Sequence, residues 1–216
     1  MTALLLAVLL AAEAPAVEGV APPAAAERLV GPEATAGLGV LGASYAQPGY
    51  RLGDAHFTPV VTARYLLGGF TTDAGVLLAV PLTRDGMALA FTGSLRIGWT
   101  WRAWSAVGGV VMQWASGATP ASQWLPSLRV SGDFGTVGMT LGVLDHFALV
   151  PAHLSFDFRA ERRRFSLGWV VPIGLVAGAD LPLSEGFGLR FTAFAFKAFQ
   201  AEVAMFTVAG TFGGGR

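Results

Sequence analysis

The sequence predicts an all-β protein, a closed antiparallel transmembrane β-barrel of about 12 strands, with about 10 as the alternative. Polar and apolar residues alternate with a period of two, as in His153, Ser155 and Asp157 against Leu154 and Phe156. Charged residues make up only 13% of the 216 residues, so the strand faces carry little charge for a water-exposed surface. Apolar runs beyond the N-terminus are broken by Pro and Gly before they reach the roughly 18 residues of a membrane helix.

The first residues predict an export signal. MTALLLAVLLAAEAPA has an apolar stretch over residues 3–12, and small residues follow at Ala14 and Ala16 in the spacing of a signal-peptidase site. We expect residues 1–16 to be a cleaved signal peptide and residues 17–33 to be a Pro/Ala-rich leader. A membrane anchor is disfavoured because the apolar run is too short to span. The chain has no cysteine, so the exported protein would use no disulfides.

The barrel itself is predicted to cover residues 34–212, and residues 213–216 form a C-terminal tail. One face of each predicted strand holds large apolar residues, whereas the other holds Gly, Ser, Thr and Ala with single charges. Large apolar residues suit a face toward lipid, and small polar residues suit the lumen of a closed barrel. The clearest strands are 56–65, 87–99, 123–131, 136–143 and 187–195, and weaker ones lie near 34–46, 72–82, 104–115, 173–181 and 199–212.

The predicted connections indicate the strand count and the orientation. About eleven connections imply about twelve strands, and the break at Pro172 is the weakest signal among them. The longest connections are 47–55, 116–122 and 145–152, all odd-numbered in chain order. If both termini lie in the periplasm, odd connections lie outside the cell, where the loops of such barrels run longer.

Tryptophans and charged residues mark the two surfaces of the predicted barrel. The tryptophans expected to form aromatic girdles at the strand ends are Trp99, Trp101, Trp104, Trp114 and Trp124. The charged residues expected to line the lumen are Arg64, Asp73, Arg96, Arg129, Asp157, Arg159, Glu161, Arg190 and Glu202. Enclosed charges must pair or meet water, so they either close the lumen as a network or line a narrow aqueous path. The excess of arginines over acids in this set predicts a weak preference for anions.

These features together resemble the outer-membrane β-barrel proteins of Gram-negative bacteria. The resemblance covers the whole mature chain and includes its last strand, AMFTVAGTF, which ends at Phe212. It implies a location in the outer membrane, contact with outer-membrane lipids, and recognition of a terminal aromatic residue by the barrel-assembly machinery. Residues 213–216 follow Phe212 here, which departs from the terminal aromatic of that class.

One short motif suggests an enzyme. His153-Leu154-Ser155 is similar to the His-x-Ser of outer-membrane phospholipase A and the lipid A deacylases, in which histidine activates serine for attack on an ester. The resemblance implies a lipid-ester hydrolase that uses His153 and Ser155, with Asp157 on the same face. The asparagine that follows the serine in those families is Phe156 here, and the phospholipase pair faces the membrane rather than the lumen. We therefore expect a polar lumen row rather than a catalytic site.

Other site classes find little support. GLGVLG at residues 37–42 matches G-x-G-x-x-G but lacks the preceding strand and following helix of a dinucleotide site. No cysteine or spaced histidine pair predicts a metal or cofactor site. The 14 basic and 14 acidic residues balance, which gives no reason to expect nucleic acid. The leading hypothesis is a narrow channel or passive transporter for small solutes. The alternatives are the hydrolase and a structural barrel with a plugged lumen.

Overall fold

A computed structural model describes residues 31–47, 50–67, 69–82, 89–116, 121–160, 163–198 and 201–213. The predicted signal peptide lies outside these residues. The elements in chain order are β1 (Gly31–Gln47), β2 (Tyr50–Phe57), β3 (Val60–Leu67), β4 (Phe70–Pro81), β5 (Ala90–Trp101), β6 (Trp104–Ala115), β7 (Ala121–Asp133), β8 (Val137–Leu144), α2 (Asp145–Ala148), β9 (Val150–Ala160), β10 (Arg163–Val171), β11 (Ile173–Ser184), β12 (Phe187–Ala198) and β13 (Ala201–Gly213).

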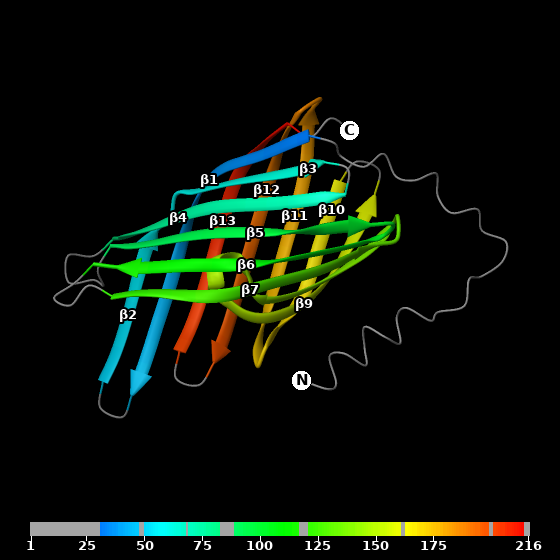
Figure 1. Ribbon diagram of the computed structural model, residues 1–216. Helices are drawn as coiled ribbons and strands as arrows, with labels where there is room; N and C mark the ends of the chain where they lie inside the picture. Colours follow the sequence, from blue (N-terminus) through cyan, green and yellow to red (C-terminus); the bar gives the residue numbers. More distant parts are fainter. Residues whose placement is uncertain are drawn as a thin grey trace.

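The strands form one antiparallel sheet that closes on itself (Figure 1). Closure is made by β1 and β13, which pair from Glu33 opposite Gly213 to Tyr45 opposite Ala201. The first strand begins at Gly31, slightly before the predicted start of the barrel. The prediction of a closed antiparallel barrel is therefore confirmed.

The thirteen strands fill twelve positions around the barrel, because β2 and β3 follow one another along the same position. Both pair with β1 on one side and with β4 on the other. Their break falls at Thr58 and Pro59, where proline has no N–H to donate. Thr58 still exchanges two backbone hydrogen bonds of 2.9 Å with Gly39, which keeps the strand position continuous. The predicted count of about twelve strands is confirmed, and Pro172 does separate β10 from β11.

One predicted connection is instead a strand. Residues 47–55 were expected to be a long loop, but residues 50–57 pair with β1 as β2. This extension makes the barrel taller on the side of β1 and β2 (Figure 1). The glycines and proline in this segment suggested a turn, whereas the backbone partner offered by the long β1 decides the conformation.

The two ends of the barrel are defined by the termini of the described chain. We call the near end the one where β1 begins and β13 finishes, and the far end the one where β1 finishes. The connections alternate between these ends because every neighbouring pair is antiparallel. In the described part of the chain, no helix combines the length and apolar character needed to cross a membrane.

Exposure of the side chains separates the two faces of each strand. In β9, His153, Ser155 and Asp157 are buried, whereas Leu154 and Phe156 are exposed. The same division holds in β5, where Leu95, Ile97 and Trp99 point outward around the buried Arg96. The barrel thus presents large apolar side chains outside and encloses polar ones.

Candidate functional site: the plugged lumen

The interior of the barrel has an apolar half and a charged half. The apolar half lies toward the far end, and its buried residues are Leu41, Val60, Leu77, Ala79, Val150, Val170, Val176, Phe194, Phe196 and Met205. A cavity of about 390 Å³ occupies the lumen beside them. The charged residues that line this cavity lie toward the near end of their strands or in the connection after β8. They are Glu33, Arg64, Asp73, Arg96, Arg129, Asp145, Asp157, Arg164, Asp180 and Arg190.

The segment between β8 and β9, residues 145–149, lies inside the lumen, and we call it the plug segment. It contacts side chains from several walls of the barrel: Gln113 of β6 donates a hydrogen bond of 3.1 Å to the carbonyl oxygen of Phe147. The His146 ring lies 6.1 Å, centre to centre, from the ring of Phe194 in β12. A side chain on Gly75 of β4 would run into the Phe147 ring. The plug segment therefore crosses the barrel rather than forming the outer loop expected for residues 145–152.

The backbone of the plug segment is strained. His146, Phe147 and Ala148 have φ values of 47°, 63° and 58°, and Leu144 just before them has φ 49°. Consecutive left-handed residues other than glycine are rare, because Cβ approaches the following carbonyl oxygen and costs about 1–2 kcal/mol per residue. Strain of this kind persists only where surrounding contacts impose it, and it concentrates at functional sites and switch regions.

Ion pairs hold the first residue of the plug segment, Asp145, against the wall of the barrel. Asp145 is 1% exposed and accepts hydrogen bonds from Arg96 and Arg129. Asp73 joins the same network, since it lies 2.6 Å from Arg96 Nε and 3.4 Å from Arg129 Nη1. The backbone N–H of His146 also donates to Asp145 Oδ1 at 2.8 Å. Two carboxylates and two guanidinium groups thus neutralise one another inside the barrel.

The remaining charges of the cavity pair closer to the near end. Arg164 donates to Asp157 at 2.6 Å. Arg190 bridges Asp180 at 2.6 Å and Glu33 at 3.0 Å. Arg64 also lines the cavity, and no ion pair joins it to any residue that the structure describes. The lining contains five arginines and five carboxylates, so the lumen carries no net charge with both histidines neutral.

Six of the nine charged residues expected in the lumen line this cavity: Arg64, Asp73, Arg96, Arg129, Asp157 and Arg190. Arg159 instead pairs with Asp133 at the near end, at 2.7 Å, where both side chains are exposed. Glu202 pairs with Lys197 across the far-end hairpin and is exposed. The expectation that Glu202 lines the lumen is wrong. β13 buries Met205 and Thr207, and since its odd-numbered residues point inward, Glu202 points outward. Glu161 lies outside the described residues.

His153, Ser155 and Asp157 share the inner face of β9, as the alternation predicted. Asp157 is engaged by Arg164. Among the hydrogen bonds of the described residues, none joins His153 to Ser155. All three side chains are buried in the lumen, away from the apolar outer surface where a lipid substrate would lie.

The tryptophans lie near both ends of the barrel. Trp99 and Trp101 are exposed at the near end, and Trp104 beside them packs edge-on against Phe134 with ring centres 5.5 Å apart. Trp114 and Trp124 are exposed on either side of the far-end connection between β6 and β7. The sixth tryptophan, Trp169, is also exposed, near the far end of β10. It was not among the expected girdle residues, although it continues the apolar row of Phe165 and Leu167 on the outer face.

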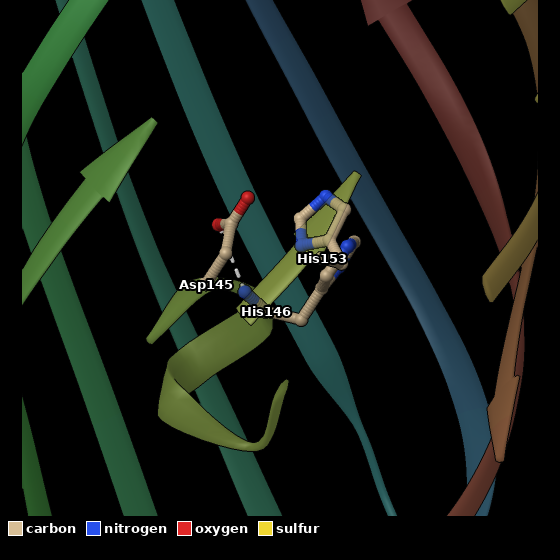
Figure 2. Close-up of side chains that lie close together, drawn as sticks. All are labelled: Asp145, His146 and His153. Carbon is tan, nitrogen blue, oxygen red and sulfur yellow. Dashed lines mark hydrogen bonds between the residues drawn. The ribbon is translucent and has the colours of Figure 1, made fainter. Parts of the chain in front are cut away.

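A cluster of possible metal ligands forms where the plug segment meets β9. One ligand atom each from Asp145, His146 and His153 lies within 4.8 Å of the others (Figure 2). The rings of His146 and His153 are 5.2 Å apart, centre to centre. This group was not predicted from the sequence, because residue 146 was expected in an outer loop. The signal in the sequence was one histidine inside the predicted connection 145–152, His146, and a second directly after it, His153.

Comparison with known proteins finds similar solved structures but no matching family. No family model matches the chain, and no curated protein matches its sequence. Among solved structures, outer membrane phospholipase A from Escherichia coli is similar at 10% identity and TM-score 0.48, over 82% of this chain and 95% of that one. The translocator domain of autotransporter NalP from Neisseria meningitidis is similar at 12% identity and TM-score 0.48, over 87% and 90%. The Ralstonia pickettii toluene transporter TbuX is similar at 10% identity and TM-score 0.45, over 90% and 94%. These solved structures are all Gram-negative outer-membrane β-barrels, and the sheet of this chain also closes into a barrel.

Proposed function

We propose that this protein is an outer-membrane β-barrel that passes small solutes through a lumen gated by the plug segment. The outer surface supports a membrane location, because exposed Leu, Ile, Val and Phe side chains cover it and tryptophans lie near both ends. Outer-membrane lipids and the barrel-assembly machinery are the partners that such a protein requires. Both termini of the barrel would then face the periplasm.

The plug segment is the observation that carries this proposal. A permanently filled lumen needs only apolar packing, which the far half of the barrel has. The plug segment is instead held by reversible ion pairs from Asp145 to Arg96 and Arg129, and its backbone is left-handed over three residues. Release of these contacts would relieve the strain, which gives the segment a second accessible arrangement.

The size of the cavity limits the solutes. A volume of about 390 Å³ lies near the lower end of the 300–1,000 Å³ that pockets for small molecules occupy. The lining is charged but neutral overall, so it suits polar solutes of either sign more than large apolar ones. For a solute to leave at the far end, the packed side chains of the apolar half must move apart.

The test is the conductance of refolded, purified protein in a planar bilayer. We expect the native chain to be mostly closed with brief openings, and Asp145→Ala to be open for a larger fraction of the time. Asp133→Ala removes a carboxylate from the exposed pair with Arg159 and should behave like the native chain. A second variant, in which residues 145–149 are replaced by a short Gly-containing turn, removes the plug itself.

The second candidate function is a structural barrel with a plugged lumen, favoured by the fully buried Val150 and Val170 in the apolar half. It would be established if neither Asp145→Ala nor the plug replacement conducts while both variants fold. Folding is checked by the heat-modifiable migration of intact barrels on gels.

A further inference from the structure

We propose that Asp145, His146 and His153 form a binding site for a divalent transition-metal ion of the zinc class, open toward the lumen cavity. All three residues line that cavity. Two imidazoles and one carboxylate are a common protein ligand set for zinc, and three protein ligands leave one position for water or a solute. Two nitrogen donors also select against calcium and magnesium, which prefer oxygen ligands. This site is independent of whether the barrel conducts.

The three ligand atoms lie close together, but they are farther apart than the ligands of a bound zinc ion. Bonds of about 2.0–2.1 Å in a tetrahedral site place neighbouring ligand atoms about 3.4 Å apart. The three ligand atoms here lie within 4.8 Å of one another, so closure needs a movement of about 1.5 Å or less. His146 is part of the plug segment, and its side chain is only partly buried beside the cavity. A rotation of this side chain is the movement that closure requires.

His153 provides a second, independent observation. Its side chain is 3% exposed, and its Nδ1 atom is buried without a hydrogen-bond partner. A buried imidazole nitrogen without a partner is costly, and a bound metal ion would supply that partner. In Figure 2 the His153 ring lies beside the carboxylate of Asp145 and above the side chain of His146.

Gly142 makes the space for this arrangement. A Cβ atom built on Gly142 would overlap Cε1 of His153 and would lie 2.7 Å from its Nδ1 and 2.9 Å from Cβ of Asp145. Any side chain at residue 142 would therefore push His153 and Asp145 apart. The absence of a side chain here is what lets two candidate ligands from β9 and the plug segment share one pocket.

The arginines around Asp145 set the expected strength of binding. A cation at this site would be repelled by Arg96 and Arg129, which now neutralise Asp145. Arg129 already lies 3.4 Å from Asp73, so it can shift toward Asp73 as a metal takes an oxygen of Asp145. Binding must compete with these ion pairs, and it therefore loosens the contact between the plug segment and the barrel wall.

The test uses Co²⁺ as a spectroscopic probe and Zn²⁺ as its competitor, with the untagged full chain refolded in detergent. The chain has only three histidines and no cysteine, so His56→Ala is a matched control outside the cluster. We expect one Co²⁺ per chain with visible absorption of a nitrogen-containing site, displaced by Zn²⁺ and not by Mg²⁺. His146→Ala and His153→Ala should each weaken binding about tenfold or more, whereas His56→Ala should leave it unchanged.

Folding and site identity are controlled separately. Each variant is used only after its heat-modifiable migration shows an intact barrel, and His146→Gln and His153→Gln replace alanine where the barrel fails to form. The proposal is overturned if the native chain takes up no Co²⁺ or Zn²⁺. It is also overturned if His56→Ala weakens binding as much as the cluster variants, or if only one of the two cluster histidines matters.

Discussion

Arg129 of β7 donates to both carboxylate oxygens of Asp145 in the plug segment through one edge of its guanidinium group. Nη2 donates to Oδ1 at 2.6 Å, and Nε donates to Oδ2 at 2.8 Å. The two residues are 16 positions apart in the chain, and the Asp145 carboxylate is almost completely buried. A bidentate pair of this kind fixes direction as well as distance. It fastens the connection between β8 and β9 to the inner wall of the barrel.

Removal of the Asp145 carboxylate should strongly destabilise the barrel. Asp145→Ala leaves the buried Arg96 and the partly buried Arg129 with one carboxylate, Asp73, between them. Loss of one partner from a buried ion pair typically costs about 3–5 kcal/mol, because the other charge stays buried. The free energy of unfolding, measured by urea titration in lipid vesicles, should fall toward that range.

The matched control for this substitution is Asp133→Ala. Its partner Arg159 is 37% exposed in the side chain, and exposed pairs contribute about 0–1 kcal/mol. If the two variants lost the same free energy of unfolding, the buried ion pairs would not be what holds the plug segment in place.

Gly142→Ala should disturb the lumen although it adds only a methyl group. The new Cβ would overlap the His153 ring and crowd Asp145. Overpacking of this kind costs about 1–3 kcal/mol, and displacement of the two residues should also weaken Co²⁺ binding. Unfolding titrations and Co²⁺ absorption measure the two effects on one sample.

Gly93→Ala is the control in the neighbouring part of the barrel. Its added Cβ would meet only the Phe91 ring at 3.5 Å, which is an ordinary contact. This variant should retain both stability and Co²⁺ binding. If Gly142→Ala behaved in the same way, the close approach of His153 to residue 142 would be wrong.

The two faces of β5 predict opposite responses to a new charge. Leu95 is 54% exposed on the outer face, whereas its neighbour Ser94 lines the cavity. Arginine in the middle of the lipid-facing surface costs about 2–4 kcal/mol, while lumen substitutions mainly change selectivity. Leu95→Arg should therefore lower the free energy of unfolding in lipid vesicles more than Ser94→Arg. The same loss in both variants would mean that the outer face does not meet lipid.

Ion selectivity should be weak in the native chain. The sequence predicted a small anion preference from five arginines against four acids. The lining of the cavity instead holds five arginines and five acids among the described residues, because it gains Arg164, Glu33, Asp145 and Asp180 and does not include Arg159 or Glu202, while Glu161 lies outside those residues. Reversal potentials across a salt gradient should lie near zero. Arg64→Glu changes the balance by two charges at a residue outside the ion-pair network, so it should shift the preference toward cations. An unchanged reversal potential in Arg64→Glu would mean that Arg64 does not line the path that ions take.

The sequence by itself determined most of the strands and, within them, the direction of most side chains. In β9, the alternation of His153 and Ser155 with Leu154 and Phe156 is a local property, since successive side chains of a strand point to opposite sides. That alternation, with little charge and no long apolar run, was sufficient for a closed barrel of about twelve strands. Closure itself satisfies the backbone groups of every strand, so it follows from the pattern without knowledge of any single contact.

Errors arose where a residue lies near the end of a strand or in a connection. Glu202 was placed inside, but the register of β13 against β12 sets it opposite Lys197 on the outer side. Residues 50–57 were expected in a loop, but the long β1 offers them a partner. Pairing partners lie far away in the sequence, so the local pattern does not fix them.

Only the tertiary structure decided what fills the lumen. The plug segment has a polar and aromatic sequence that suits an outer loop, and its inward position depends on Arg96 and Arg129, which lie 49 and 16 residues before Asp145. The cluster with His146 and His153 follows from the same inward fold. Burial of Asp145 is favourable only once the barrel has closed and presents both guanidinium groups to it, so no local pattern predicts it.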